Sequence, residues 1–170
     1  MPRTRASFLC LLALLAVTPA WGDHDCQPNV FTTTLFAGQT IDAGDVIAQV
    51  VGDQLCVTYA AHSDWVIEEV HVAIGSSLAD IPQTKKGNPR PGQFPLKATY
   101  QPGVNTATLC TPFIAGFDEV FVAAHAVVTG RPGGAYSGQE ETGWGDGFDF
   151  PGSNWATYFR FVPIICTPHE

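Results

Sequence analysis

Basic residues are scarce in this chain of 170 residues. It contains eight Lys and Arg against 16 Asp and Glu, which gives a formal net charge of −8. Proteins that bind nucleic acids or anionic lipids neutralise phosphates with clustered Lys and Arg side chains. The composition therefore argues against nucleic acid and anionic membranes as partners, and it favours cations or neutral molecules.

The familiar motifs of enzyme active sites are also missing. The sequence contains no G-x-S-x-G, no H-E-x-x-H, no phosphate-binding loop and no G-x-G-x-x-G before a helix. No two cysteines form a C-x-x-C pair, which disfavours a zinc knuckle. We therefore expect a protein that binds a ligand rather than an enzyme.

Long apolar runs are absent except at the N-terminus. There, ten apolar residues at 8–17 follow a basic start and precede small residues suited to cleavage before Asp23. This order is typical of a secretory signal peptide, and the run is too short to span a bilayer, which takes about 20 residues. We predict a signal peptide at residues 1–22 and a single soluble, extracellular domain at residues 23–170.

The number of cysteines agrees with secretion. Of the five, Cys10 would leave with the signal peptide and four would remain. An even number in a secreted domain predicts two disulfides, for which three pairings are possible. We expect Cys26–Cys166 to tie the two ends of the domain together and Cys56–Cys110 to join two predicted strands.

Sustained helical periodicity is absent as well, and short β-branched and aromatic runs alternate with glycine and proline. The predicted strands span residues 30–36, 46–51, 54–59, 65–74, 94–100, 104–110, 119–128 and 155–162. Residues 81–93 and 129–153 form two long loops, and residues 76–80 could form one helical turn. We predict an all-β fold, an antiparallel, jelly-roll-like β-sandwich of about eight strands, stapled by disulfides.

Residue alternation along two strands predicts which side chains face the core. All even-numbered residues from 120 to 128 are aliphatic, so they should face the core and leave His125 on the outer face. In the strand at 65–74, the even-numbered apolar residues from 70 to 74 mark the core side. Its outer face would carry Trp65, Ile67, Glu69, His71 and Ala73. Because this outer face is not very polar, we expect the glycine-rich loop with Trp144 to cover it.

Glu69, His71 and His125 would meet beneath that loop if the two strands are neighbours. Histidine with a carboxylate is a ligand set for zinc or another transition metal. The same groups could act as a general acid–base pair. A hydrogen-bonded pair with a purely structural role is the third possibility.

The loop at 138–152 combines several glycines with the carboxylates of Glu140, Glu141, Asp146 and Asp149. Glycines let the backbone bend so that several oxygens face one point, and Ca²⁺ takes six to eight oxygen ligands. The pattern is not that of an EF-hand. The loop is therefore a candidate calcium site, with a solvated acidic loop as the alternative.

Aromatic residues accompany these carboxylates. Trp144 and Trp155 are candidate platforms for a sugar ring, provided that they are exposed. Alternatively, the aromatic rings of this region anchor the loop on the sheet by burying large apolar areas.

The segment at 139–159 reads QEETGWGDGFDFPGSNWATYF and resembles a signature of secreted β domains that lack an established activity and occur in extracellular and bacterial surface proteins. The segments at 38–44, 79–94 and 122–127 resemble the same family. The matching positions include His125, Glu141, Trp144, Asp146 and Trp155. This resemblance implies a secreted β domain.

Together these patterns give one expected function and two alternatives. We expect a secreted, non-catalytic binding or structural module that holds Ca²⁺ through residues 138–152. The first alternative is a carbohydrate-binding module that uses Trp144 and Trp155. The second is a metal-dependent enzyme that uses His71 and His125. An extracellular glycan or protein is the expected partner.

Overall fold

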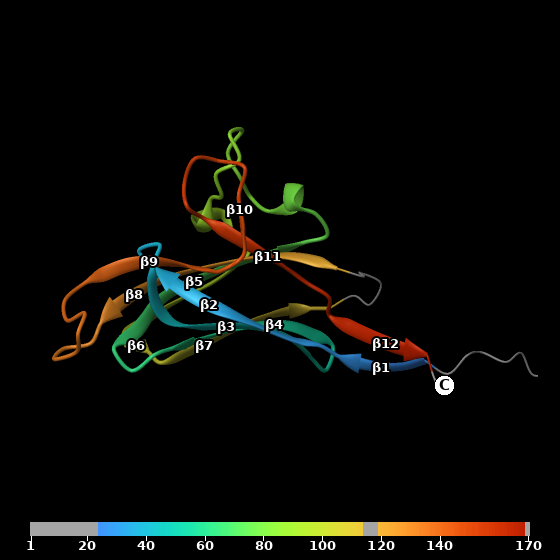
Figure 1. Ribbon diagram of the computed structural model, residues 1–170, viewed down its shortest axis with the longest axis horizontal. Helices are drawn as coiled ribbons and strands as arrows, with labels where there is room; N and C mark the ends of the chain where they lie inside the picture. Colours follow the sequence, from blue (N-terminus) through green and yellow to red (C-terminus); the bar gives the residue numbers. More distant parts are fainter. Residues whose placement is uncertain (1–23, 114–118, 169–170) are drawn as a thin grey trace, which may run out of the picture.

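The computed structural model describes residues 24–113 and 119–168, and this part of the chain is mainly antiparallel β-structure (Figure 1). The strands are β1 (His24–Pro28), β2 (Val30–Ala37), β3 (Ile41–Val51), β4 (Gln54–Ala61), β5 (Trp65–Gly75), β6 (Leu96–Val104), β7 (Thr106–Pro112), β8 (Val120–Gly130), β9 (Glu140–Gly145), β10 (Phe148–Asp149), β11 (Thr157–Phe161) and β12 (Ile164–Pro168). Two short 3₁₀ helices, η1 (Leu78–Asp80) and η2 (Pro91–Gln93), lie between β5 and β6.

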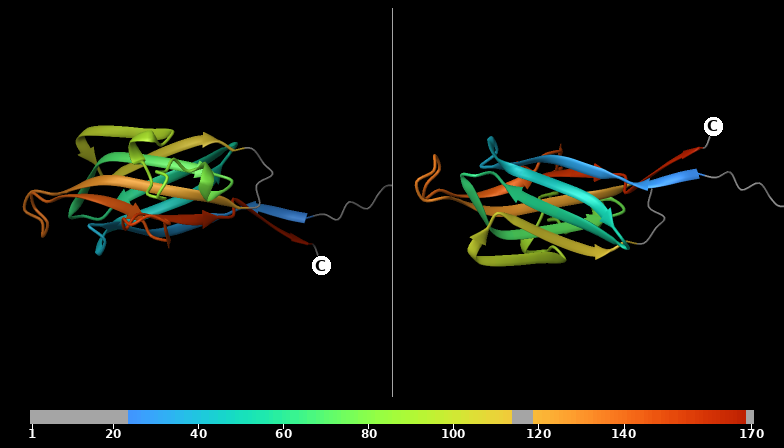
Figure 2. Two further views of the ribbon diagram at one scale, coloured as in Figure 1. Left: turned by 90° about the horizontal axis from the view of Figure 1, so that it is seen from above. Right: turned by 90° about the horizontal axis from the view of Figure 1, so that it is seen from below.

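One antiparallel sheet forms most of the molecule and curves until its two edges nearly meet. Its hydrogen-bonded path runs β6-β5-β8-β9-β2-β3-β4-β7, so eight strands surround the core. Strand β11 pairs with the start of β8, and β9 pairs with its later part. In Figure 2, the layer with β8 faces the viewer, beneath the loops, when the molecule is seen from above, and the layer with β3 and β4 faces the viewer when it is seen from below. The predicted antiparallel, all-β sandwich is confirmed.

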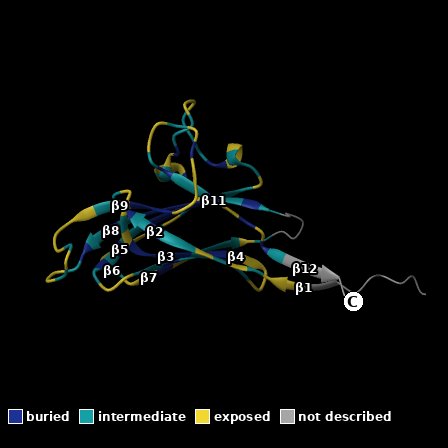
Figure 3. Ribbon diagram, in the orientation of Figure 1, coloured by how far each residue is buried: buried dark blue, intermediate teal, exposed yellow. Residues whose placement is uncertain are grey.

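The core lies between the two layers, and the aliphatic face of β8 points into it. All even-numbered residues of β8 from 120 to 128 are buried there, as the alternation predicts. They pack against side chains of the opposite layer such as Val46, Val57 and Tyr59. Figure 3 shows the buried residues along these strands and the exposed residues mainly at the loops. Outward-facing residues of β8, including His125, therefore lie on the other side of the sheet.

Strict alternation fails in the first half of β5. It predicts Trp65 and Ile67 on the outer face, but both are buried in the core. The pairing of β5 with β6 and with β8 shifts between Ile67 and Glu69, so that Glu68 is an extra residue in the strand. A β-bulge of this kind reverses the alternation beyond it. The prediction is therefore wrong before the bulge and right after it, where His71 lies on the outer face.

The Cys56–Cys110 disulfide is confirmed and joins β4 to β7, where the two residues lie opposite each other. The register of β1 and β12 likewise places Cys26 opposite Cys166. Their side chains lie outside the described residues, so this second disulfide stays a prediction. The predicted signal peptide also lies outside the described residues. In the part of the chain that is described, no helix is long and apolar enough to cross a membrane.

Removal of the Cys56–Cys110 disulfide should lower the free energy of unfolding. The cross-link joins residues that are 54 positions apart. We expect the double substitution Cys56→Ala, Cys110→Ala to cost about 2–4 kcal/mol, because the unfolded chain regains conformational freedom. Urea denaturation of both proteins measures the difference. An unchanged midpoint and slope would contradict the expectation.

Candidate functional site

Two loops cover the outer face of β5 and β8, and we call them the lid (residues 76–95 and 146–156). Figure 1 shows both loops on the same side of the sheet. The predicted helical turn at 76–80 is present as η1 in the first loop. Apolar residues of the lid and the sheet form a second buried cluster of Ala73, Ile81, Phe94, Ala123, Trp144, Phe150 and Ala156. The glycine-rich segment covers this face as predicted, and the proline-rich loop contributes equally.

Asn88 fastens the two lid loops to each other. Its Oδ1 accepts hydrogen bonds from the backbone N–H groups of Ser153, at 2.8 Å, and Asn154, at 3.1 Å. Gly152 passes so close that a Cβ atom there would overlap with Asn88 Oδ1. A side chain at this position would therefore push the loops apart. No sequence pattern indicates this contact, because it joins residues more than 60 positions apart.

Beneath the lid, the structure brings together Glu69, His71 and His125. The two histidines lie opposite each other on β5 and β8, and their Nδ1 atoms are 3.2 Å apart. The Nε2 atom of His71 lies 2.9 Å from a carboxylate oxygen of Glu69. Only 6% of His71 and 7% of His125 are exposed. We call this row of three side chains the histidine relay.

Burial keeps both imidazoles neutral. Desolvation, followed by the nearby His71, lowers the pKa of His125 to about 3. Desolvation also lowers the pKa of His71, and Lys97 acts in the same direction, whereas Glu69 raises it. In the neutral state His71 donates its Nε2–H to Glu69, which leaves its Nδ1 to accept the Nδ1–H of His125. The relay is thus a chain of hydrogen bonds that leads from the surface into the sheet.

Trp144 closes the relay from above. It lies opposite His125 in the pairing of β8 with β9, and the ring centroids are 4.8 Å apart at an angle of 60°. Glu69 lies beside Nε2 of His71, whereas His125 lies beside Nδ1 of the same ring. The three side chains that could ligate a metal therefore form a row and do not surround one point. Among the described residues, no group of three or more His, Cys, Asp or Glu is arranged to hold a metal ion. A structural, hydrogen-bonded role fits this geometry best.

The four carboxylates of the expected calcium site are divided into two pairs. Glu140 and Glu141 belong to the start of β9, whereas Asp146 and Asp149 follow its end. Asp146 lies five residues after Glu141, and five steps of extended chain span about 16 Å. The structure therefore does not bring the four side chains to one point, because most of the segment pairs with β2 and β8 as a strand.

Asp146 and Asp149 instead share a groove with Trp155. This groove has a volume of about 250 Å³. It is lined by Phe36, Gln39, Trp144, Asp146, Gly147, Asp149, Trp155 and Thr157. Trp155 is half-buried, but Trp144 is only 5% exposed and packs in the lid. The expectation of an exposed Trp144 is therefore wrong, because the ring lies against His125 and contributes only to the floor of the groove.

Backbone contacts hold Asp146 in place at the groove. Its N–H donates to the carbonyl of Thr34 at 2.8 Å, and its carbonyl accepts from the hydroxyl of Thr33 at 3.0 Å. Its own Oδ1 accepts from the N–H of Gly147 at 2.9 Å. The carboxylate is thus oriented by the backbone, and no described residue donates a hydrogen bond to its Oδ2.

Gln39 is a groove residue that the sequence did not reveal. It has a φ of 80°, in the left-handed region, in the turn between β2 and β3. Residues other than glycine rarely adopt this conformation, which costs about 1–3 kcal/mol and often occurs at functional sites. The only signal in the sequence is the glycine before it, which indicates a turn but not a groove.

The groove and the histidine relay are two polar features on this side of the sheet. The groove is open to a ligand, whereas the relay is buried and reaches solvent through Glu69, whose side chain is 39% exposed. Comparison with family models, curated proteins and solved structures gives no match for this chain.

Proposed function

We propose that the protein is a secreted, non-catalytic binding domain whose groove takes a neutral sugar unit of an extracellular glycan. One observation carries this proposal, namely that Trp155, Asp146, Asp149 and Gln39 line the same groove. Sugar rings present C–H faces that pack on aromatic rings, and their hydroxyls donate to carboxylates and to amide oxygens.

Secretion is supported by two independent features. The N-terminal segment at 1–22 has the order of a signal peptide. The Cys56–Cys110 disulfide fits an oxidising compartment, where such bonds persist. The resemblance of residues 139–159 to secreted β domains points the same way.

Calcium is the second candidate ligand, because Asp146 and Asp149 share the groove. Two carboxylates supply only part of the six to eight oxygens that Ca²⁺ takes. Sugar hydroxyls and water would have to complete the shell. Calcium would then act as a bridge between the protein and the glycan, and glycan binding would depend on it.

Binding to soluble oligosaccharides tests the proposal. We expect the tryptophan fluorescence of the mature protein to change saturably with at least one of the neutral cello-, xylo-, manno- and chito-oligosaccharides. Trp155→Ala should weaken this binding about tenfold, because the ring contact is lost. Gln39→Gly should fold at least as well as the wild type, because glycine adopts a positive φ freely. It should bind several-fold more weakly, because one hydrogen bond of about 1 kcal/mol is lost.

Phe148→Ala is the matched control. Phe148 is 51% exposed in the same lid loop but does not line the groove. Its removal should leave glycan binding unchanged. Binding that is equal in Ca²⁺ and in chelator supports the groove alone, whereas binding that requires Ca²⁺ supports the second candidate. Absence of binding to any of the sugars, or an unchanged affinity of Trp155→Ala, would contradict the proposal.

A further inference from the structure

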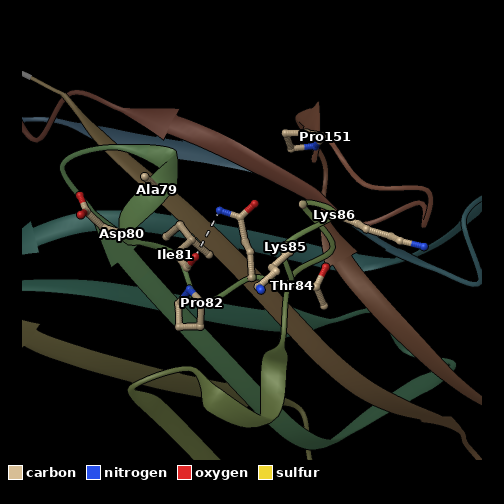
Figure 4. A pocket seen from close by; sticks show the side chains of 10 residues that line it. Ala79, Asp80, Ile81, Pro82, Thr84, Lys85, Lys86 and Pro151 are labelled. Carbon is tan, nitrogen blue, oxygen red and sulfur yellow. Dashed lines mark hydrogen bonds between the residues drawn. The ribbon is translucent and has the colours of Figure 1, made fainter.

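A second hollow, at the tip of the first lid loop, differs from the groove in charge. It has a volume of about 570 Å³ and lies between residues 79–87 and Pro151. The lysines Lys85 and Lys86 line it, and both are exposed. Figure 4 shows the Lys85 and Lys86 side chains extending in different directions from the turn, with Asp80 at the far end of the hollow.

Basic residues are concentrated on this part of the lid. The described residues contain six Lys and Arg, and three of them, Lys85, Lys86 and Arg90, lie in the first lid loop. Lys85 and Lys86 form no ion pair with any described residue, and neither of their backbone N–H groups donates to a described acceptor. Two ammonium groups and two N–H groups are therefore available at one turn of an acidic protein.

Asp80, the acidic residue of the hollow, is already occupied. Its Oδ2 accepts the hydroxyl of Ser76 at 2.9 Å, the N–H of Ser77 at 2.9 Å and the hydroxyl of Ser77 at 3.0 Å. This carboxylate therefore serves the turn at η1 rather than the lysines. Its negative charge nevertheless remains at the far end of the hollow, away from the two lysines (Figure 4).

The turn that carries the lysines is well ordered by its own contacts. The N–H of Gly87 donates to the carbonyl of Thr84 at 2.9 Å, and the N–H of Thr84 donates to the carbonyl of Asn88 at 2.8 Å. Gln83 donates its amide to the carbonyls of Leu78 and Ile81, at 2.6 and 3.2 Å. Gly87 has a φ of 83° and lies against Pro151, which connects the turn to the second loop. The backbone of the turn, with its two N–H groups, is therefore held in place before a ligand binds, whereas none of these contacts fixes the exposed lysine side chains.

We propose that this hollow binds a single oxyanion, a sulfate or phosphate group, through Lys85 and Lys86. Ammonium groups and consecutive backbone N–H groups of a turn are the donors that such anions favour. A volume of this size also accommodates a sugar that carries the anion as an ester. The surrounding net charge of −8 repels long polyanions but interacts far less with one small anion. The inference does not depend on the groove, which lies on residues other than these lysines.

Titration followed by amide NMR tests this site. Inorganic sulfate and, separately, galactose 6-sulfate and glucose 6-phosphate are added to the mature protein, with the ionic strength kept constant by NaCl. We expect saturable shifts at residues 84–87. The double substitution Lys85→Gln, Lys86→Gln should weaken binding about tenfold, because two charge-assisted contacts are lost.

Lys97→Gln is the matched control, because Lys97 is exposed on β6 and does not line the hollow. It should bind like the wild type. If an ester binds more tightly than sulfate, the ligand is an anion carried by a sugar. If the two bind equally, the ligand is the free anion. Both results support an oxyanion site. Absence of a saturable shift, or equal affinity of the double variant and the wild type, would overturn the proposal. Neither result affects the oligosaccharide titration of the groove.

Discussion

Acidification is expected to destabilise the protein steeply below pH 6.5, because His71 and His125 are buried as neutral groups. The pKa of both is below that of a histidine in the unfolded chain. The unfolded chain therefore binds protons that the folded protein does not take up, and each neutral histidine removes up to about 1.4 kcal/mol of stability per pH unit. For His125 this loss continues until the pH approaches about 3. By pH 4 its share amounts to about 3 kcal/mol.

Urea denaturation at a series of pH values measures this slope. His125→Gln removes the titrating group, so its stability should depend less on pH than that of the wild type. The matched control is His62→Gln, because the side chain of His62 is half-exposed and lies beside Asp42 and Asp45 at the surface. Parallel pH profiles for the wild type and His125→Gln would contradict the account of a buried neutral pair.

Trp144→Ala should cause the largest loss of stability among single substitutions in the buried cluster beneath the lid. The ring contacts His125, with Phe94 and Phe150 at centroid distances of 6.3 Å each. Replacement of a buried tryptophan by alanine costs about 3–5 kcal/mol through lost burial and the cavity that remains. We expect the lid to loosen and His125 to become hydrated, so that the pKa of His125 rises toward its ordinary value.

Trp155→Ala separates this effect from a general loss of aromatic packing. Trp155 is half-buried at the edge of the same cluster, so its replacement should cost distinctly less. Urea denaturation gives the stabilities, and NMR titration of the imidazole signals gives the pKa of His125 in each variant. A loss for Trp144→Ala no greater than that for Trp155→Ala would show that the lid does not depend on this ring.

Strand positions and one face of the sheet follow from the sequence because they depend on local alternation. The aliphatic residues of β8 locate the core, and this places His125 on the outer face. The bulge at Glu68 depends instead on how β5 fits two neighbouring strands, and no pattern within β5 specifies it. Alternation alone therefore does not predict on which side of the sheet Trp65 lies.

In the candidate site, too, local sequence patterns predict some features, whereas others depend on tertiary contacts. The glycines and carboxylates after Gly138 favoured one flexible loop, but the pairing of Glu140–Gly145 with both β2 and β8 turns this segment into a strand. Only Asp146 and Asp149 remain at the groove. Gln39 joins them from a distant turn, and this meeting depends on tertiary contacts alone. The net charge of the chain likewise does not reveal the lysines of the lid, because it sums acidic and basic residues from all parts of the surface.

The tryptophan indole N–H signals give the most direct test of the proposed groove. Three tryptophans lie within the predicted mature chain, with Trp155 at the groove, Trp144 beneath it and Trp65 in the core on the other side of the sheet. On addition of a neutral oligosaccharide that binds, the account predicts a large shift of the Trp155 signal, a smaller shift of Trp144 and none of Trp65. A ligand that binds without moving the Trp155 signal, or that moves Trp65 instead, would contradict it.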